Sequence, residues 1–245
     1  MLDNIKAENV LFLDIETVPQ YENFDSVPET FKEFWEKKSA YFREEDQSAS
    51  DVYQRAGIYS EFGKIICISV GILINKGEKK AFRLKSFFGD DEKIILEEFA
   101  QMLKKYHASN SDLQLCAHNG KEFDFPYISR RMLINGVKLP KLLDTAGKKP
   151  WEVMFLDTME LWKFGDYKNY TSLNLLTQIF EIPTPKDDID GSMVADVYYK
   201  EKDISRIIKY CEKDVLAIAQ LLLKYKGESI IEHENVESTT ENRLL

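Results

Sequence analysis

Two acidic residues that directly follow an apolar run have the greatest chemical potential in this sequence. Residues 10–13 are all apolar, Asp14 comes next, and Glu16 follows two positions later in "LFLDIETVP". Side chains two residues apart on a strand point to the same face of the sheet. A buried carboxylate is costly unless it is paired, hydrogen-bonded or bound to a metal. Because two like charges this close repel each other, the pattern indicates a cation between them.

Two further acids lie where predicted elements begin or turn. Asp124 follows a predicted strand that ends near Asn119 and directly precedes a predicted helix, and Asp214 lies four residues after Tyr210 on another helix. Residues at this spacing share one helix face. Taken alone, Asp124 could be a helix N-cap and Asp214 a surface acid paired with a lysine, just as D-x-E could be a polar strand end. Together, four acids could bind a pair of Mg²⁺ or Mn²⁺ ions, which prefer carboxylate and water ligands.

The apolar pattern predicts the elements that must position these acids. A tight hairpin makes part of the sheet antiparallel, and the later alternation of strands with helices makes part of it parallel. The expected fold is therefore α/β, with a mixed five- or six-stranded sheet flanked by helices. The predicted strands span residues 9–15, 64–74, 81–88 and 113–119, and the predicted helices span 29–45, 90–106, 124–137, 171–180 and 203–225, with a further helix beginning at Asp157.

Length and composition predict one large domain. The chain has 245 residues, of which 44% are hydrophobic, enough for a single substantial core. We expect one domain over residues 1–225, with a helical insertion at about 26–58, and a polar, disordered tail over 226–245. Residues 1–60 hold 13 acidic and 6 basic side chains. The net charge of -9 therefore arises mainly at the chain ends, and it does not exclude a nucleic acid partner.

The sequence favours a cytoplasmic protein. It has no apolar run of about 18 residues that would predict a membrane helix, and its first residues lack the basic and apolar regions of a secretory signal. Three cysteines without C-x-x-C spacing, Cys67, Cys116 and Cys211, are typical of buried thiols in a reducing compartment. We therefore expect no membrane partner.

Three segments, in this order, resemble the DEDD (DnaQ-like) superfamily of 3'-5' exonucleases, which have a ribonuclease H-like fold. "LFLDIETVP" is similar to the first motif, D-x-E; "HNGKEFDFPYI" is similar to the second, with Asn119, Phe123 and Asp124 at the matching positions. "YCEKD" resembles the third motif in the Y-x(3)-D form of the tyrosine (DEDDy) subgroup. With "YKNYTSLNLL" and "PTPKDDIDGS", the likeness covers about residues 8–225 and is strongest to stand-alone exonucleases similar to the proofreading domain of family B DNA polymerases.

The resemblance implies a two-metal-ion site for phosphodiester hydrolysis. By match to the motifs, Asp14, Glu16 and Asp214 would hold the ion that carries the attacking water. Asp14 would bridge to a second ion, supported by Asp124, which stabilises the leaving 3'-oxygen. Tyr210 would orient the water, because its ordinary pKa is too high for a strong base.

The resemblance also implies substrate contacts and a substrate class. Thr17, Asn119 and Phe123 would lie near the last nucleotides, although Phe123 could equally be a core residue, and Asp157 is expected to be an N-cap. We expect release of nucleoside 5'-monophosphates from single-stranded DNA, with DNA favoured over RNA. Basic residues could contact phosphate or simply be solvated; they are Arg130, Arg131, Lys148, Lys149, Lys163 and Lys168.

Three alternatives remain open at this point. The same motifs could serve an exoribonuclease, since none of them reads the 2'-hydroxyl. A haloacid dehalogenase-type phosphatase also begins with an apolar strand and D-x-D, but Glu16 replaces its second aspartate. It also needs a later Gly-Asp-x(3)-Asp after an apolar strand, and the dense acidic run "KDDID" follows "IPTP" and lacks that context. A non-catalytic nucleic-acid-binding module would be signalled by loss of an acid, and no acid of the motifs is lost.

Overall fold

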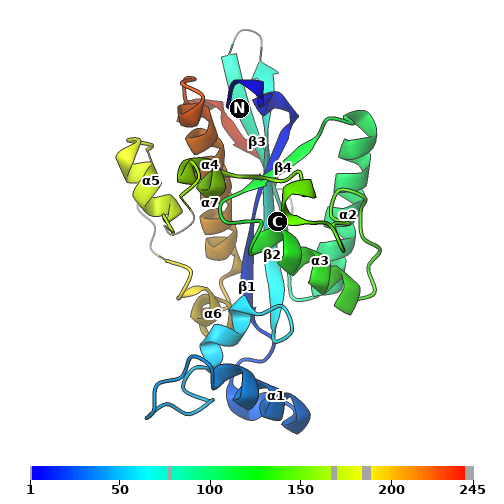
Figure 1. The fold of residues 1–245 in the computed structure, drawn as a ribbon, viewed down its shortest axis with the longest axis vertical. Coiled ribbons are helices and arrows are strands. Elements are labelled where there is room, and N and C mark those ends of the chain that lie inside the picture. Colours follow the sequence, from blue (N-terminus) through cyan, green and yellow to red (C-terminus); the bar gives the residue numbers. More distant parts are fainter. Residues whose placement is uncertain (1, 77–78, 167–169, 184–188, 241–245) are drawn as a thin grey trace.

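A mixed six-stranded sheet forms the centre of the computed structural model, which describes residues 2–76, 79–166, 170–183 and 189–240 (Figure 1). The strands are β1 (Val10–Pro19), β2 (Gly63–Lys76), β3 (Lys79–Phe88), β4 (Gln114–Ala117), β5 (Leu156–Asp157) and β6 (Val236–Ser238). Their order in the sheet is β5-β4-β1-β2-β3-β6. β1, β2 and β3 are antiparallel neighbours, and the other three pair in parallel. This confirms the expected hairpin and mixed sheet.

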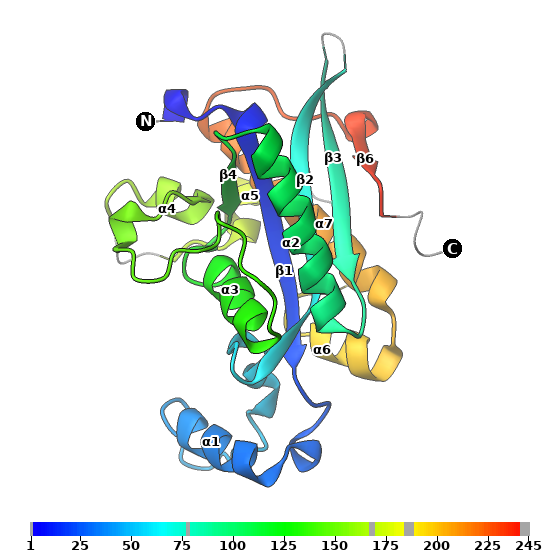
Figure 2. The same cartoon turned by 90° about the vertical axis from the view of Figure 1, so that its right-hand side faces the viewer.

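Helices cover both faces of the sheet, which is consistent with a ribonuclease H-like fold. The helices are α1 (Glu29–Ser39), α2 (Glu92–Ser109), α3 (Asp124–Ile134), α4 (Thr158–Lys163), α5 (Leu173–Ile179), α6 (Val194–Asp196) and α7 (Ile204–Tyr225). Figures 1 and 2 show α2 and α3 on one face and α7 on the other. No helix within the described parts of the chain is long and apolar enough to cross a membrane.

β1 contributes to the core on both of its faces. Leu13 and Ile15 pack into the cluster beneath α2 and α3, whereas Val10 and Phe12 pack into the cluster beneath α7. This alternation follows from the two-residue period of a strand. Because Asp14 and Glu16 continue the series of Val10 and Phe12, their side chains lie on the α7 face.

β1 is much longer than its neighbour β4. The pairing of the two strands covers only Val10–Phe12 of β1, while β2 pairs with β1 over Leu11–Pro19. Beyond Phe12, the β4 side of β1 therefore has no strand beside it. The acids of β1 lie in this half of the strand, where another element can approach them from the side.

The helical insertion expected at about 26–58 lies between β1 and β2 in the chain (Figure 2). It has its own small hydrophobic core. Trp35 is fully buried there, and its Nε1 donates to the Ala49 carbonyl at 2.8 Å. Phe42 packs against the Trp35 ring with 5.9 Å between centroids. The expected helix over 29–45 ends at Ser39, because the chain must turn there to bring Phe42 and Ala49 back onto Trp35.

The expectation of a disordered tail over 226–245 is wrong for its described part. β6 pairs with β3 in parallel, and Ile231 is buried at 4% exposure. The Gln220 side chain on α7 accepts from the Ile231 N–H at 2.8 Å and donates to the Ile231 carbonyl at 2.9 Å. The polar composition hid these anchors: a few apolar residues and an open edge of β3 are enough to order the segment.

Candidate active site

Asp14 and Glu16 meet a cysteine from α7 on the α7 face of β1. One ligand atom each from Asp14, Glu16 and Cys211 lie within 4.8 Å of one another. Across the β1–β2 pair, Asp14 lies opposite Ser69 and Glu16 lies opposite Cys67. The structure thus gathers both acids of "LFLDIETVP" in one place, as their strand spacing predicts.

Asp124 approaches the same place from the open side of β1. It is 3% exposed and begins α3. The backbone N–H of Ile15 donates to its carboxylate, so the unpaired edge of β1 holds the acid directly. Oδ1 of Asp124 is buried without a hydrogen-bond partner among the described residues. A buried oxygen of this kind can accept from a water or bind a metal ion.

Asp214 and Tyr210 complete the cluster from α7. The Tyr210 hydroxyl donates to the Asp214 carboxylate, as the four-residue spacing allows. The negative charge of Asp214 raises the pKa of Asp14, of Glu16 and of Asp124. All four acids of the motifs are therefore close enough to interact electrostatically.

Burial and mutual repulsion raise the pKa of each inner carboxyl. For Asp14 and Glu16, desolvation is the largest cause, and neighbouring acids raise the pKa further. For Asp124, desolvation and the charges of Asp157 and Asp214 raise the pKa to about 7, although backbone N–H hydrogen bonds oppose the rise. Four carboxylates that disfavour one another's charge could together hold a hard divalent cation, and the donor set fits Mg²⁺ or Mn²⁺.

Cys211 is a member of the site that the sequence analysis missed. Its Sγ lies 3.4 Å from Oδ2 and 3.5 Å from the backbone oxygen of Asp14. Burial raises the pKa of the thiol, and hydrogen bonding to Cys67 raises it further, so Cys211 is a neutral donor to Asp14 rather than a thiolate ligand. Its place beside Tyr210 in "YCEKD" was the available signal.

Thr17 and Phe123 lie toward α3. The register of the β1–β2 pair shifts between Glu16 and Thr17. The Thr17 side chain hydrogen-bonds the Tyr127 hydroxyl on α3. Tyr127 also donates to the Gly57 carbonyl at 2.8 Å, which ties this region to the insertion. The partly buried Phe123 ring packs on Tyr127 with 5.4 Å between centroids. Phe123 is therefore at least in part a core residue.

Asn119 is held by Asp157 in an unusual conformation. Its φ of 60° is left-handed, and its N–H donates to Oδ1 of Asp157 at 2.9 Å. Asp157 also accepts from the Met159 N–H at 2.9 Å, as an N-cap of α4 does. Oδ1 of Asn119 is buried with no hydrogen-bond partner in the described chain, so its amide is available to a ligand.

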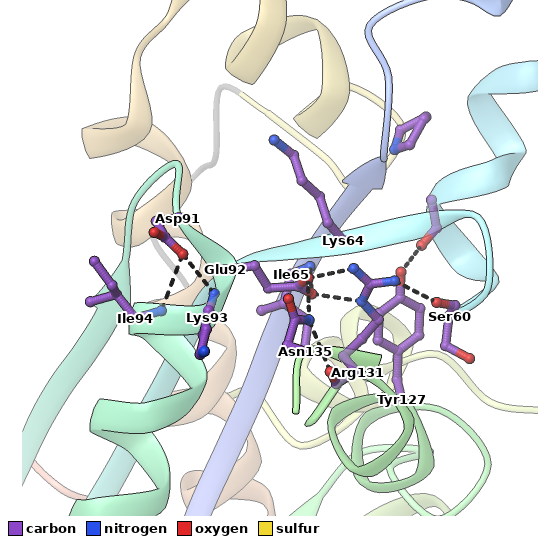
Figure 3. Close-up of polar contacts among 12 residues, drawn as sticks. Ser60, Lys64, Ile65, Asp91, Glu92, Lys93, Ile94, Tyr127, Arg131 and Asn135 are labelled. Atoms are coloured by element: carbon purple, nitrogen blue, oxygen red, sulfur yellow. Dashed lines mark hydrogen bonds and ion pairs between the residues drawn. The ribbon is translucent and has the colours of Figure 1, made fainter. Parts of the chain in front are cut away.

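Arg131 is not a phosphate contact. Figure 3 shows its guanidinium paired with Glu92, at 2.8 Å from Nε to Oε1, and its Nη1 donating to the Ser60 carbonyl at 2.9 Å. Arg131 is 4% exposed, and Glu92 also accepts from the Ile65 N–H and the Asn135 amide. The helical periodicity of α3 places Arg131 on the face of that helix that packs against the core. Arg130 is exposed, whereas Lys168 and residues 184–188 lie outside the described residues.

Comparison with known families identifies the chain over most of its length. Residues 58–241 match the family described as "Predicted 3'-5' exonuclease related to the exonuclease domain of PolB". Asp124, Tyr210 and Asp214 lie inside the match, whereas Asp14 and Glu16 precede it. The family match therefore says nothing of Asp14 and Glu16, and it is the geometry of the site that brings them together with the matched residues.

The solved structures similar to this chain include the family B DNA polymerase from the hyperthermophilic archaeon Pyrobaculum calidifontis, with 16% sequence identity and a TM-score of 0.49. The alignment covers 88% of this chain and 24% of the polymerase chain, so this chain spans about a quarter of that protein's length. Comparison with curated proteins finds no match.

Proposed function

Because the chain belongs to the family of predicted 3'-5' exonucleases related to the exonuclease domain of PolB, we propose that it is a metal-dependent enzyme that releases nucleoside 5'-monophosphates from the 3' end of single-stranded DNA. One observation carries the proposal. Acids from β1, from the start of α3 and from α7 converge, and they mutually raise their pKa values. We assign the enzyme to the tyrosine (DEDDy) subgroup through Tyr210.

Four carboxylates would hold the metal. Asp14, Glu16, Asp124 and Asp214 supply oxygen ligands from three elements. Two bound Mg²⁺ or Mn²⁺ ions would supply a water of lowered pKa and charge stabilisation for the leaving 3'-oxygen. The orphaned Oδ1 of Asp124 supports its role as a ligand.

Tyr210 would orient the attacking water without acting as a base. Burial and the charge of Asp214 raise the pKa of its phenol, so the hydroxyl stays protonated at neutral pH. A neutral hydroxyl both donates and accepts hydrogen bonds. It can therefore donate to Asp214 while it accepts from a water in the site.

Three residues would position the end of the strand. Thr17 follows the β1 acids directly, and Oδ1 of Asn119 is a buried acceptor without a partner among the described residues. Phe123 is partly exposed and can contact a base. The kinship of the family with a polymerase exonuclease domain favours DNA over RNA.

A 5'-labelled single strand tests the proposal directly. With Mn²⁺, the wild type is expected to shorten a DNA 20-mer from its 3' end, and Asp14→Asn is expected to abolish the laddering. Asp112→Asn, which changes an exposed acid, is the matched control and should retain activity. Laddering that persists in Asp14→Asn would contradict the assignment. A parallel RNA strand decides the substrate: faster shortening of RNA would make the protein an exoribonuclease.

A further inference from the structure

Glu212 on α7 gathers three hydroxyl groups onto a single carboxylate oxygen. Its Oε1 accepts from Ser86 Oγ at 2.9 Å, from Ser238 Oγ at 2.9 Å and from Thr240 Oγ1 at 2.6 Å. Ser86 belongs to β3, Ser238 ends β6, and Thr240 follows it. Hydrogen bonds to a charged acceptor are about twice as strong as neutral ones. Glu212 thus fastens α7 to β3 and to the C-terminal segment at once.

Glu212 and its three hydroxyl donors, Ser86, Ser238 and Thr240, form a cluster that we call the clasp. Two of these donors are well buried. Thr240 is 3% exposed and Ser86 is 1% exposed. The Ser86 N–H donates to Thr240 Oγ1 at 2.9 Å, and the Thr240 N–H donates to Ser238 Oγ at 3.1 Å. The donors and acceptors of this segment therefore satisfy one another, which is the condition for a rigid buried polar network.

The same network continues to the strand pair that carries the acids. Ser69 Oγ lies 2.7 Å from Ser86 Oγ, and Cys67 Sγ lies 3.6 Å from Ser69 Oγ. Because the single Ser86 hydroxyl hydrogen goes to Glu212, Ser69 must donate to Ser86. Ser69 lies opposite Asp14 on the neighbouring strand. A continuous chain of polar contacts thus runs from Thr240 to the cross-strand partner of Asp14.

The position of Glu212 on α7 explains how the clasp can fix the orientation of the acids. It lies midway between Tyr210 and Asp214, and two residues of an α-helix correspond to about 200° around the axis. Tyr210 and Asp214 share one side of α7, so Glu212 lies on nearly the opposite side. Fixing Glu212 to β3 and the C-terminal segment therefore fixes the rotation of α7, and with it the direction of Asp214 and of Cys211.

We propose that Glu212 is a positioning residue for the metal-binding carboxylates, and that residues 236–240 belong to the scaffold of the site although they supply no ligand. The inference rests on the proposed function, because it assumes that the acids bind a metal. Small displacements of ligands weaken a metal site, and loss of a supporting hydrogen bond typically costs 10–100-fold in metal affinity or activity, which are approximate values.

Isothermal titration calorimetry of Mn²⁺ binding to the metal-free chain of 245 residues tests the proposal. Glu212→Ala and the double variant Ser238→Ala/Thr240→Val are expected to bind Mn²⁺ about tenfold more weakly. Glu212→Gln retains an acceptor oxygen and is expected to restore most of the affinity. Thr239→Val is the matched control: it removes the 3.0 Å hydrogen bond to the Leu84 carbonyl within the same segment but outside the clasp, and should bind Mn²⁺ as the wild type does.

The outcomes separate this inference from the proposed function. A lower melting temperature with unchanged Mn²⁺ affinity in Glu212→Ala and in the double variant would overturn it, since a merely structural clasp changes only stability. If Glu212→Ala does not fold, the Mn²⁺ affinities of the double variant and of Glu212→Gln decide whether the inference holds. A wild type that binds Mn²⁺ and responds to these variants but leaves DNA and RNA intact would refute the exonuclease and leave the positioning role standing.

Discussion

The thiol of Cys211 on α7 donates a hydrogen bond to the carboxylate of Asp14 on β1, with 3.4 Å between Sγ and Oδ2. The contact joins the helix of the third motif to the strand of the first, although 197 residues separate the two in the chain. Groups that hydrogen-bond a metal ligand orient it and tune its affinity. We therefore expect this neutral thiol to matter for metal binding without touching the metal.

Removing the thiol should weaken metal binding while a hydroxyl should preserve it. Cys211→Ala is expected to raise the dissociation constant for Mn²⁺ about tenfold, because Asp14 loses its donor. Cys211→Ser keeps a donor and should stay near the wild-type value. Cys116→Ala, at another fully buried cysteine, controls for the loss of packing alone. Equal Mn²⁺ affinities in Cys211→Ala and Cys116→Ala, measured by calorimetry, would show that the hydrogen bond is irrelevant.

The metal-free protein should become less stable as pH rises from 5 to 8. A carboxyl with a raised pKa in the folded state binds more protons there than in the unfolded chain, so the free energy of unfolding falls between the two pKa values. For Asp124 this window runs from 3.8 to about 7, and the raised pKa values of Asp14 and Glu16 act in the same direction. Carboxyls of lowered pKa, such as Glu228, lose their contribution to stability only as the pH falls below their ordinary pKa of 4.5, which lies under the range from pH 5 to 8.

Scanning calorimetry with EDTA or with Mn²⁺ checks this dependence. Mn²⁺ should raise the melting temperature more at pH 8 than at pH 5, because the metal competes with protons for the same oxygens. Asp124→Asn should flatten the pH dependence of the metal-free protein. A metal-free wild type that is more stable at pH 8 than at pH 5 would contradict the raised pKa values.

Tyr210→Phe should slow turnover far more than it weakens metal binding, because the hydroxyl would orient the attacking water as well as donate to Asp214. The variant keeps the ring but removes the hydroxyl that donates to Asp214; one hydrogen bond to a charged group is worth about 1.5–3 kcal/mol, so we expect kcat to fall about tenfold or more. Tyr225→Phe is the control, because the Tyr225 hydroxyl has no hydrogen-bond partner among the described residues. Single-turnover rates that are equal in the two variants would remove Tyr210 from the mechanism.

Arg131→Met should destabilise the protein severely. The variant leaves Glu92 buried without its cation, and breaking a buried ion pair from one side costs about 3–5 kcal/mol. Urea unfolding should show a lower midpoint for Arg131→Met and little change for the exposed Arg130→Met. In the double variant with Glu92→Gln, the loss should be smaller than the sum of the single losses. A single-variant loss as small as that of Arg130→Met would mean that the pair in Figure 3 contributes nothing.

Local pattern was sufficient for most of the fold. The hairpin of β2 and β3 and the amphipathic α7 follow from periodicity, and α7 begins where the Asp203 side chain caps it by accepting from the Arg206 N–H. Pattern failed where long-range contacts overrode it. Packing on Trp35 ended α1 early, and Ile231 with β6 ordered a segment whose composition suggested disorder.

The sequence by itself determined which acids share a strand or helix face, because residue type and local spacing fix this, and from it we predicted that they would take a hard cation. Only the tertiary structure decided what surrounds them. The approach of Asp124 to the open edge of β1, the Cys211 thiol on Asp14, the pairing of Arg131 with Glu92 and the clasp on Glu212 each join residues far apart in the chain. Such contacts depend on how the elements pack in space, and local sequence carries no record of that packing.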